Sequence, residues 1–411
     1  MTILMAAILW LAVASALLAL AYRRTLSAAW REPVLRAPVL ILESDDWGYG
    51  PLLQSQRLER IADLLAGFTD VRGRHAVMTL GVVLGGPDTD RMHAGDYRAY
   101  HRTTLMDPRL EPVRDAMLRG AARGVFALQL HGMEHYWPSC LMHAAATDGA
   151  IRNWLTESTF PCTEALPSAL QSRWIDVTKL PSSPLPADEV AAAANEEVRV
   201  FTATFGRTPD VVVPSTFVWT AEVEAAWARE GLRVVVTPGT RSESRDAQGR
   251  IVVGKRTYFN AASGPRGVSY VVRDCYFEPS MGHNHERAMD ALRSKTYEAR
   301  PTLLETHRAN FIGEEGEAQH ALDEVKRLLE AARNAFPGLR FMSTAELVQH
   351  YRERSALVER RASARVHFLI RRLARVSRLR KLAWVTGVVL PAWLTYVFTR
   401  PRALLHAEST V

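Results

Sequence analysis

The chain has 411 residues and is 47% apolar, enough for one large domain or for two to three ordinary ones. Its three cysteines, Cys140, Cys162 and Cys275, are an odd number without CxxC spacing, which argues against a disulfide framework and favours a reducing compartment. The net charge of +7 is local, because residues 356–381 alone carry +8 and all other residues sum to about −1. This distribution excludes a nucleic-acid-binding surface spread over a domain.

The first apolar stretch predicts a membrane anchor. Residues 3–22 contain no charged side chain, and a helix of this length spans the hydrocarbon layer of a bilayer. A secretory signal would have a basic start and a small-residue cleavage site, whereas here Arg23, Arg24 and Arg31 follow the stretch. We therefore expect a transmembrane anchor within residues 1–25, with the rest of the chain on the cytoplasmic side of the inner membrane.

Strand-like apolar runs then alternate with helical patterns, which is typical of an α/β fold with parallel strands. The expected strands cover residues 38–42, 75–80, 125–130, 210–213, 233–237, 269–273 and 302–305. The expected helices cover residues 54–67, 111–123, 187–205, 221–230 and 316–336. Seven strands in a β/α series predict an incomplete seven-stranded (β/α) barrel over residues 37–350, with its chemistry at the carboxyl ends of the strands.

One connection in this series is unusually long. Residues 136–186 show little periodicity and contain six prolines, so we expect a long loop, of the kind that often forms a lid or binding loop. The loop contains Trp137, Trp154 and Trp174. Two interpretations remain open: the rings stack on sugar, or they anchor the loop to the body.

A basic and apolar helical tail follows the barrel. Residues 356–381 predict a basic amphipathic helix, with Val366, Leu369, Leu373 and Val376 on one face. The arginines around that face are Arg365, Arg371, Arg372, Arg375 and Arg378. We expect the helix to lie on anionic membrane lipids; a solvated surface helix is the alternative. The apolar residues 382–399 predict a membrane-associated segment that spans, re-enters or lies at the interface.

Polar residues at the strand ends indicate a metal site. Asp45 and Asp46 follow the first expected strand, and His131 and His135 follow the third. Because strand carboxyl ends meet at one barrel face, we expect these side chains to lie together. Two imidazoles and one carboxylate make a three-ligand site with an open position, as in hydrolytic zinc enzymes. Zn²⁺ is the expected divalent metal; iron, cobalt and manganese are alternatives.

His307 closes the seventh expected strand, within Leu-Leu-Glu-Thr-His-Arg. A third strand-end histidine that is not needed as a ligand is a natural general acid, because the pKa of histidine lies near working pH. A hydrogen-bonded structural histidine is the alternative.

With these residues the chain resembles the polysaccharide deacetylase (NodB-homology) family of metal-dependent N-deacetylases. Residues 43–47 (Glu-Ser-Asp-Asp-Trp) resemble its Thr-Phe-Asp-Asp-Gly-like motif, residues 131–135 its His-(Ser/Thr)-x-x-His motif, and residues 305–307 its late Leu-x-His motif. The resemblance covers roughly residues 38–344. It implies Asp45 as the base and Asp46 as a metal ligand together with the two histidines.

The third family motif is altered. It should supply an arginine that orients the base and a backbone N–H for the oxyanion. The nearest match, residues 211–216, keeps a proline but lacks arginine, so the N–H of Ser215 is the candidate oxyanion donor. Arg273, at the end of the sixth expected strand, is the candidate replacement for the missing arginine; a surface ion pair is its alternative interpretation. These changes indicate a divergent member.

The expected function is removal of an N-acetyl or similar acyl group from a lipid-linked or nucleotide-linked amino sugar in envelope polysaccharide assembly. Two alternatives remain. One is a metal-containing barrel that binds glycan without turnover. The other is a zinc peptidase, because residues 131–135 also fit H-x-x-E-H with Glu134 as base and Glu196 or Glu197 as a further ligand.

Overall fold

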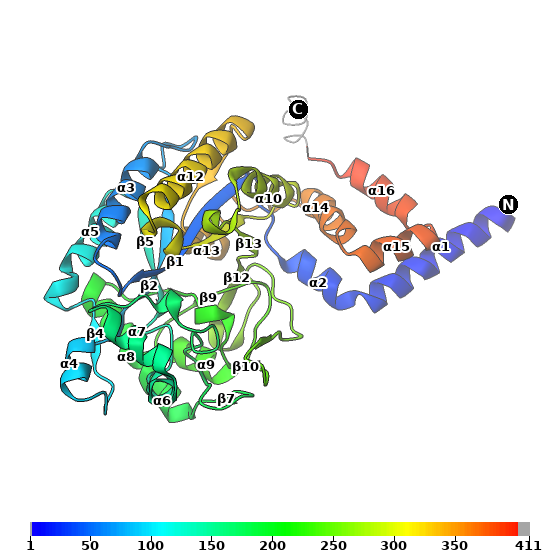
Figure 1. Ribbon diagram of the computed structural model, residues 1–411. Coiled ribbons are helices and arrows are strands. Elements are labelled where there is room, and N and C mark those ends of the chain that lie inside the picture. The colour runs from blue at the N-terminus through cyan, green and yellow to red at the C-terminus, as the bar shows by residue number, and fades with distance from the viewer. Residues whose placement is uncertain (1, 402–411) are drawn as a thin grey trace.

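A nine-stranded parallel sheet forms the body of the protein in the computed structural model, which describes residues 2–401 (Figure 1). The strand order is β12-β9-β8-β5-β2-β1-β14-β13, with β15 paired to β1. The strands are β1 (Val39–Gly48), β2 (Met78–Val83), β5 (Phe126–Gly132), β8 (Val211–Val212), β9 (Val234–Thr237), β12 (Ser269–Val272), β13 (Cys275–Tyr276), β14 (Thr302–His307) and β15 (Arg340–Phe341). The end strands β12 and β13 are not paired with each other within the described residues. The predicted incomplete barrel is therefore confirmed, and its seven strands correspond to β1, β2, β5, β8, β9, β12 and β14.

Helices cover the outside of this sheet (Figure 1). The long ones are α3 (Gln54–Ala66), α5 (Glu111–Ala122), α8 (Ala187–Phe205), α9 (Ala221–Arg229), α10 (His285–Tyr297), α12 (Glu315–Ala335) and α13 (Thr344–Arg352). The shorter elements are α4 (Thr89–Ala94), α11 (Ala309–Ile312) and the hairpins β3 (Gly85–Pro87) with β4 (Arg102–Thr104) and β10 (Ser244–Arg245) with β11 (Ile251–Val252). All five predicted helices form, because each buries one apolar stripe against the sheet.

The barrel interior changes from apolar to charged along the strands. Side chains of a strand alternate between its two faces, so Val39 and Ile41 share a face with Glu43 and Asp45 on β1. Val39 and Ile41 pack with Val271 and Leu303 in one apolar cluster at the amino ends of the strands. The same faces carry charged and polar groups further along. The apolar floor thus supports a polar layer at the carboxyl ends.

Residues 136–186 are more ordered than the predicted long loop. They form α6 (Pro138–Thr147), α7 (Gly149–Glu157) and the hairpin β6 (Ile175–Asp176) with β7 (Ser183–Pro184). Trp154 and Trp174 are buried, with their rings packed edge-on to Tyr136 and Trp227. These two tryptophans are therefore anchors of the insertion, whereas Trp137 is half-buried.

A helical bundle projects from the barrel and holds both ends of the described chain (Figure 1). It consists of α1 (Thr2–Ala21), α2 (Arg23–Arg31), α14 (Ala362–Ala374), α15 (Ser377–Thr386) and α16 (Val389–Phe398). α1 is long and apolar enough to cross a membrane, and the pair α15–α16 meets the same test with a 106° bend, as a broken span or re-entrant pair would. Residues 356–381 are therefore not one amphipathic helix, since α14 ends at Ala374 and α15 begins at Ser377.

The arginines of α14 do not all face outward. Arg371 and Arg372 are buried, which corrects the prediction that both surround a lipid-binding face. The Arg372 guanidinium donates hydrogen bonds of 2.8–3.2 Å to five backbone carbonyls. These carbonyls belong to Ala29, Glu32, Pro33, Glu298 and Ala299. A guanidinium has five N–H groups, so this arginine joins α14, the end of α2 and the barrel with every donor in use.

This clamp lies at the amino pole of the barrel. Glu32, which precedes β1, accepts hydrogen bonds from Arg300, just before β14, and from Asn260, which precedes β12. In a parallel barrel all strands run in one direction, so the bundle is attached at the end opposite to the strand carboxyl ends.

Replacing the clamp should loosen the bundle from the barrel. Arg372→Met leaves five buried backbone carbonyls without this donor and removes the guanidinium that lies 3.6 Å from the Glu32 carboxylate, which costs about 3–5 kcal/mol. We expect a lower melting temperature and faster protease cleavage between α2 and β1. Arg378→Met, at an exposed position on α15, is the matched control and should behave as wild type. Equal melting and cleavage of the two variants would contradict the clamp.

Candidate metal centre and active site

Two backbone irregularities direct functional side chains into the barrel mouth, which is the opening at the carboxyl ends of the strands. The pairing of β1 with β2 shifts register between Ser44 and Trp47, and Asp46 has a left-handed φ of 72°. In a regular strand Asp45 and Asp46 would point to opposite faces; the bulge turns both toward the mouth. The pairing of β2 with β5 also shifts, next to His131, where Gly132 has a φ of 115°.

Asp46, His131 and His135 converge as predicted. The Asp46 Oδ1 atom lies 3.3 Å from His131 Nε2 and 3.2 Å from His135 Nε2, and the two Nε2 atoms are 3.1 Å apart. All three side chains are buried, and one ligand atom from each lies within 4.8 Å of the others. The sequence thus identified three groups that are close enough to share one ion.

These residues fit a divalent metal. His131 Nδ1 donates a 2.8 Å hydrogen bond to the Val213 carbonyl, which leaves the Nε2 lone pair directed toward Asp46. Asp46 Oδ1 is buried without a hydrogen-bond donor. Burial lowers the pKa of His135 to about 4, which keeps its imidazole neutral, the form that binds a metal. One carboxylate and two imidazoles are a zinc-type donor set with room for another ligand.

Asp45 is held by Arg273. The Arg273 Nη2 donates a 2.5 Å hydrogen bond to Asp45 Oδ2, and both side chains are buried. Burial alone would raise the pKa of Asp45, but the charge and hydrogen bond of Arg273, together with the charges of His131 and His307, outweigh it and the net pKa is lowered. Asp45 Oδ1 has no hydrogen-bond donor, and Gly81 leaves the space beside it open, because a Cβ there would lie 2.3 Å from this oxygen. Arg273 is thus not in a surface ion pair.

Two further carboxylates surround Arg273, and the sequence interpretation missed both. Glu43 Oε2 accepts a 2.9 Å hydrogen bond from Arg273 Nη1, and Glu305 Oε2 lies 3.3 Å from Arg273 Nε. Burial raises the pKa of Glu305 to about 7. The signal was available, since Glu43 and Glu305 lie two residues before Asp45 and His307 and share their strand faces.

His307 has its own acidic partner. Its Nδ1 lies 2.7 Å from Glu278 Oε1, and Asp45 is its neighbour across the β1–β14 ladder. Burial lowers the pKa of His307, but the hydrogen bond that its ring donates to Glu278 and the charges of Asp46, Glu278 and Asp45 raise it to about 10. Glu278 follows the two-residue strand β13, and no sequence pattern marks it.

Ser215 lies against the metal-binding strand. It is fully buried in the turn after β8, and its hydroxyl donates a 3.2 Å hydrogen bond to the His131 carbonyl. Phe217, in the same turn, places its ring 5.2 Å from the Arg273 guanidinium and covers it. The turn thus lies beside the site, and the use of the Ser215 N–H for an oxyanion stays a proposal.

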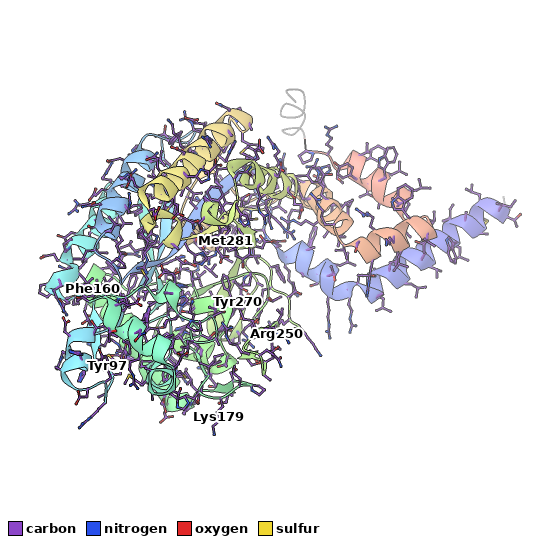
Figure 2. All side chains as sticks on the ribbon, in the orientation of Figure 1. Tyr97, Phe160, Lys179, Arg250, Tyr270 and Met281 are labelled. Carbon is purple, nitrogen blue, oxygen red and sulfur yellow. The ribbon has the colours of Figure 1, made fainter. Side chains whose placement is uncertain are left out.

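The insertion reaches the rim of the same mouth. Glu164 accepts hydrogen bonds of 2.9 and 2.6 Å from buried Arg308, whose Nη1 donates to the Tyr49 carbonyl and whose backbone N–H donates to the Asp45 carbonyl. Phe160 of the insertion (Figure 2) packs edge-on to the Tyr49 ring. Arg308 therefore fastens the insertion to the carboxyl end of β1.

The peptidase interpretation fails on geometry. His131 lies in strand β5, not one helical turn from His135, and residues 131–135 form no helix. Glu134 is fully buried and paired with Arg102 and Arg173, so it is not directed at the His131–His135 pair as a base. Of its proposed acidic partners, Glu197 pairs with Arg173 and Glu196 with Arg102.

Comparison with known proteins finds likeness at the level of solved structures. No family model matches the chain, and no curated protein matches it. A putative polysaccharide deacetylase from Mycobacterium smegmatis is 11% identical, with 80% of this chain and 99% of that chain covered and a TM-score of 0.37. A peptidoglycan deacetylase from Bacillus subtilis is 10% identical, with 79% and 94% covered and a TM-score of 0.35.

A 4-alpha-glucanotransferase from Thermococcus litoralis is 7% identical, with a TM-score of 0.40. The match covers 77% of this chain but only 40% of the length of that enzyme. Likeness at this level assigns no activity. A function for this chain therefore has to be inferred from the chemistry of its own side chains.

Substitutions of the two adjacent aspartates should have different effects on metal binding. Asp46→Ala removes a proposed ligand and should lower Zn²⁺ affinity at least about 100-fold, since even outer partners of metal ligands are worth about 10–100-fold. Asp45→Asn should retain one equivalent of metal. Elemental analysis and competition with a chromogenic chelator on the full-length protein measure both. Retention of full affinity by Asp46→Ala would contradict the ligand assignment.

Proposed function

We propose that this protein is a metal-dependent amidohydrolase that removes an N-acetyl or similar acyl group from an amino sugar, in the assembly of envelope polysaccharide. One observation carries the proposal: Asp46, His131 and His135 share a buried point beside a base held by Arg273 and an acid held by Glu278. A bound divalent metal would polarise the acyl carbonyl and lower the pKa of a water molecule there.

The side chains supply the proton transfers. Asp45 takes a proton from the attacking water through Oδ1, the oxygen without a donor, while Arg273 holds the other oxygen. The water oxygen attacks the acyl carbon, and the Ser215 N–H is the candidate donor to the developing oxyanion. His307, kept protonated by Glu278, gives its proton to the leaving nitrogen as the C–N bond breaks. The products are acetate and the free amine.

The non-catalytic alternative loses its main support. That interpretation depended on the arginine missing from the third motif. Arg273, the residue that follows β12, reaches Asp45, so the proposed base has a guanidinium partner although the motif lacks one. A catalytic site with a relocated arginine is the simpler account of this geometry.

The direction of the mouth bears on the substrate. The helices that we propose as the membrane anchor are clamped to the amino pole, and the site opens at the carboxyl pole. The ten residues of β1 alone separate the two poles by about 33 Å, at about 3.3 Å per residue. We therefore propose a nucleotide-linked sugar, or a sugar carried on a long lipid-linked glycan, as the substrate. With α1 as an inner-membrane anchor, the mouth would open into the cytoplasm.

Acetate release from N-acetylated amino sugars tests the activity. Full-length enzyme with one equivalent of Zn²⁺ should release acetate from UDP-N-acetylhexosamines or N-acetylhexosamine oligomers. Asp45→Asn should lower kcat about 10²–10⁴-fold, the usual contribution of a general base, while metal content stays unchanged. Glu134→Gln, a change outside the mouth, is the control that the peptidase mechanism would make inactive. Loss of turnover in Glu134→Gln with full turnover in Asp45→Asn would overturn the proposal.

Removal of the Glu278 carboxylate should change the pH profile. The acid form of His307 is the active one, so the rate falls as pH rises through its pKa. Glu278→Gln removes the group that raises this pKa, so the alkaline limb of kcat/KM should move to lower pH by about one unit or more. Rates near pH 6 should change much less. Glu286→Gln, at an exposed position on α10, should leave the limb in place. An unmoved limb in Glu278→Gln would remove His307 from the acid role.

A further inference from the structure

Glu305, on β14, is a buried carboxyl group that has no part in the proposed proton transfers. Its Oε2 atom lies 3.3 Å from Arg273 Nε, without the alignment of a hydrogen bond, and its Oε1 atom lies 3.9 Å from His307 Nε2. Within the part of the chain that the structure describes, no group donates a hydrogen bond to either oxygen. The Glu305 carboxyl therefore keeps acceptor capacity beside the proposed acid.

Glu43, another carboxyl group held by Arg273, differs in this respect. It is paired with Glu305 across the β1–β14 ladder. Its two oxygens accept hydrogen bonds from Arg273 and Thr344, and its side chain has no accessible surface. The Glu305 side chain keeps 4% of its surface accessible, and its fully buried oxygen is Oε2, the one at Arg273. Glu43 is thus satisfied inside the protein, whereas Glu305 can receive a donor from a bound molecule at Oε1.

This Oε1 atom lies close to the place that the leaving atom of a substrate must reach. His307 uses Nδ1 for Glu278, so Nε2 is the nitrogen that can give a proton to the substrate. An atom that takes this proton lies about 3 Å from Nε2. Because Nε2 and Oε1 are 3.9 Å apart, the same atom can also lie about 3 Å from Oε1. The leaving atom would then be within hydrogen-bond distance of the acid and of the carboxylate.

Amides and esters differ at this atom. The leaving nitrogen of a secondary amide carries an N–H, which can donate a hydrogen bond to the Glu305 carboxylate. The leaving oxygen of an ester carries no proton, so beside Glu305 two acceptors would face each other. A site that is built to bind an N–H rejects the analogue without it, because the polar group of the site is then left unpaired.

We propose that Glu305 makes this site selective for amides over esters, by accepting the N–H of the leaving nitrogen at Oε1 while His307 protonates the same nitrogen. Glu305 takes up no proton in this step. The electron pair of the breaking C–N bond goes to nitrogen, and the new proton comes from His307. The inference rests on the proposed deacetylation and adds the residue that recognises a nitrogen leaving group. The substrate class is N-acylated amino sugars in preference to O-acylated sugars.

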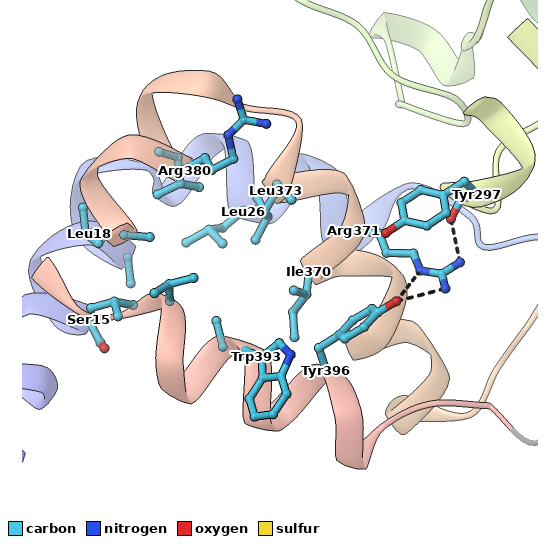
Figure 3. A pocket seen from close by; sticks show the side chains of 17 residues that line it. Ser15, Leu18, Leu26, Tyr297, Ile370, Arg371, Leu373, Arg380, Trp393 and Tyr396 are labelled. Carbon is cyan, nitrogen blue, oxygen red and sulfur yellow. Dashed lines mark hydrogen bonds between the residues drawn. The ribbon is translucent and has the colours of Figure 1, made fainter. Parts of the chain in front are cut away.

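The cavity inside the helical bundle offers no such contact. It measures about 390 Å³ and is walled largely by apolar side chains, among them Leu18, Leu26, Ile370, Leu373 and Trp393 (Figure 3). Among the described residues that line it, none is acidic, so an amide N–H would find no carboxylate there. Burying an unpaired polar group costs free energy. The discrimination between amide and ester therefore belongs to the mouth.

Glu305→Gln, which keeps the shape of the side chain and removes its charge, tests this role in the full-length protein with Zn²⁺. Acetate release is measured from an N-acetylhexosamine and from the same sugar with a 2-O-acetyl group, each as a UDP conjugate and as an oligomer. The ratio of kcat/KM for the amide to kcat/KM for the ester should fall at least about 10-fold relative to wild type. The change in this ratio is the measure, because esters are intrinsically more reactive than amides.

Glu43→Gln is the matched control. It makes the same change on another carboxyl group of Arg273 and should affect both substrates by a common factor, which leaves the ratio unchanged. An unchanged ratio in Glu305→Gln, or an equal fall in Glu43→Gln, would overturn the role of Glu305 while wild-type turnover of the amide still supported the deacetylation. Wild type that releases acetate from no N-acetylated sugar would overturn the deacetylation, and this inference with it.

The wild-type pH profile is a second test that does not depend on the folding of a variant. Burial raises the pKa of Glu305 to about 7, so the carboxylate form is present above this pH and is lost below it. The amide-to-ester ratio should therefore rise several-fold between about pH 6 and about pH 8, and stay flat in Glu305→Gln. Titrations that affect both substrates alike cancel in the ratio. A flat wild-type ratio would contradict the role of Glu305. The charged and titratable groups around Glu305 are Glu43, Asp45, Arg273, Tyr276, Glu278 and His307.

Discussion

The contact between Arg273 and three buried carboxylates is the interaction on which the site depends. Glu43, Asp45 and Glu305 all lie within 3.3 Å of this guanidinium, inside a barrel whose floor is apolar. Burying an unpaired carboxylate costs several kcal/mol, and one guanidinium compensates only part of this charge. Burial raises the pKa of Glu43 and of Glu305, whereas the pKa of Asp45, which is bonded to Arg273, is lowered. One arginine thus holds together the three carboxylates and keeps Asp45, the proposed base, ionised.

The same physical device is used at the other pole. Arg372, like Arg273, is a buried arginine that joins segments far apart in the sequence, but its partners are neutral carbonyls. The junction also contains one carboxylate, Glu32, which lies 3.6 Å from Arg372 Nη1 and bonds Arg300. The barrel is therefore fixed to its helical bundle by a contact that lies away from the titrating groups in the mouth. The candidate site and the contact between bundle and barrel thus lie at opposite ends of the strands.

Much of this arrangement was predictable from local patterns. Valine-rich runs bounded by turns located the strands, and the rule that parallel strands end at one face brought Asp46, His131 and His135 together before any coordinates. Period-two alternation would also have identified Glu43 and Glu305. Glu278 was not predictable, because a two-residue strand carries no periodic signal and its partner is 29 residues away.

The errors have a common cause. An arginine-rich helix looks the same in sequence whether its guanidinium groups meet lipid or backbone carbonyls, so Arg371 and Arg372 were assigned to the surface. The sequence pattern does not predict the helices of the insertion, because α6 and α7 are only ten and nine residues long and are stabilised by tertiary packing of Tyr136, Trp154 and Leu141. In both cases the deciding partner lies far away in the chain.

The bulge at Asp46 links strain to function. A left-handed φ at a non-glycine residue costs about 1–3 kcal/mol unless the surroundings fix it. Here the next residues are fixed firmly: Trp47 is fully buried with its indole bonded to Ser44, and Gln54 bonds both the N–H and the carbonyl of Gly48. The fold therefore maintains the conformation that directs Asp46 toward the two histidines. Because this backbone is already in place, a metal ion would meet a ligand set that needs little rearrangement.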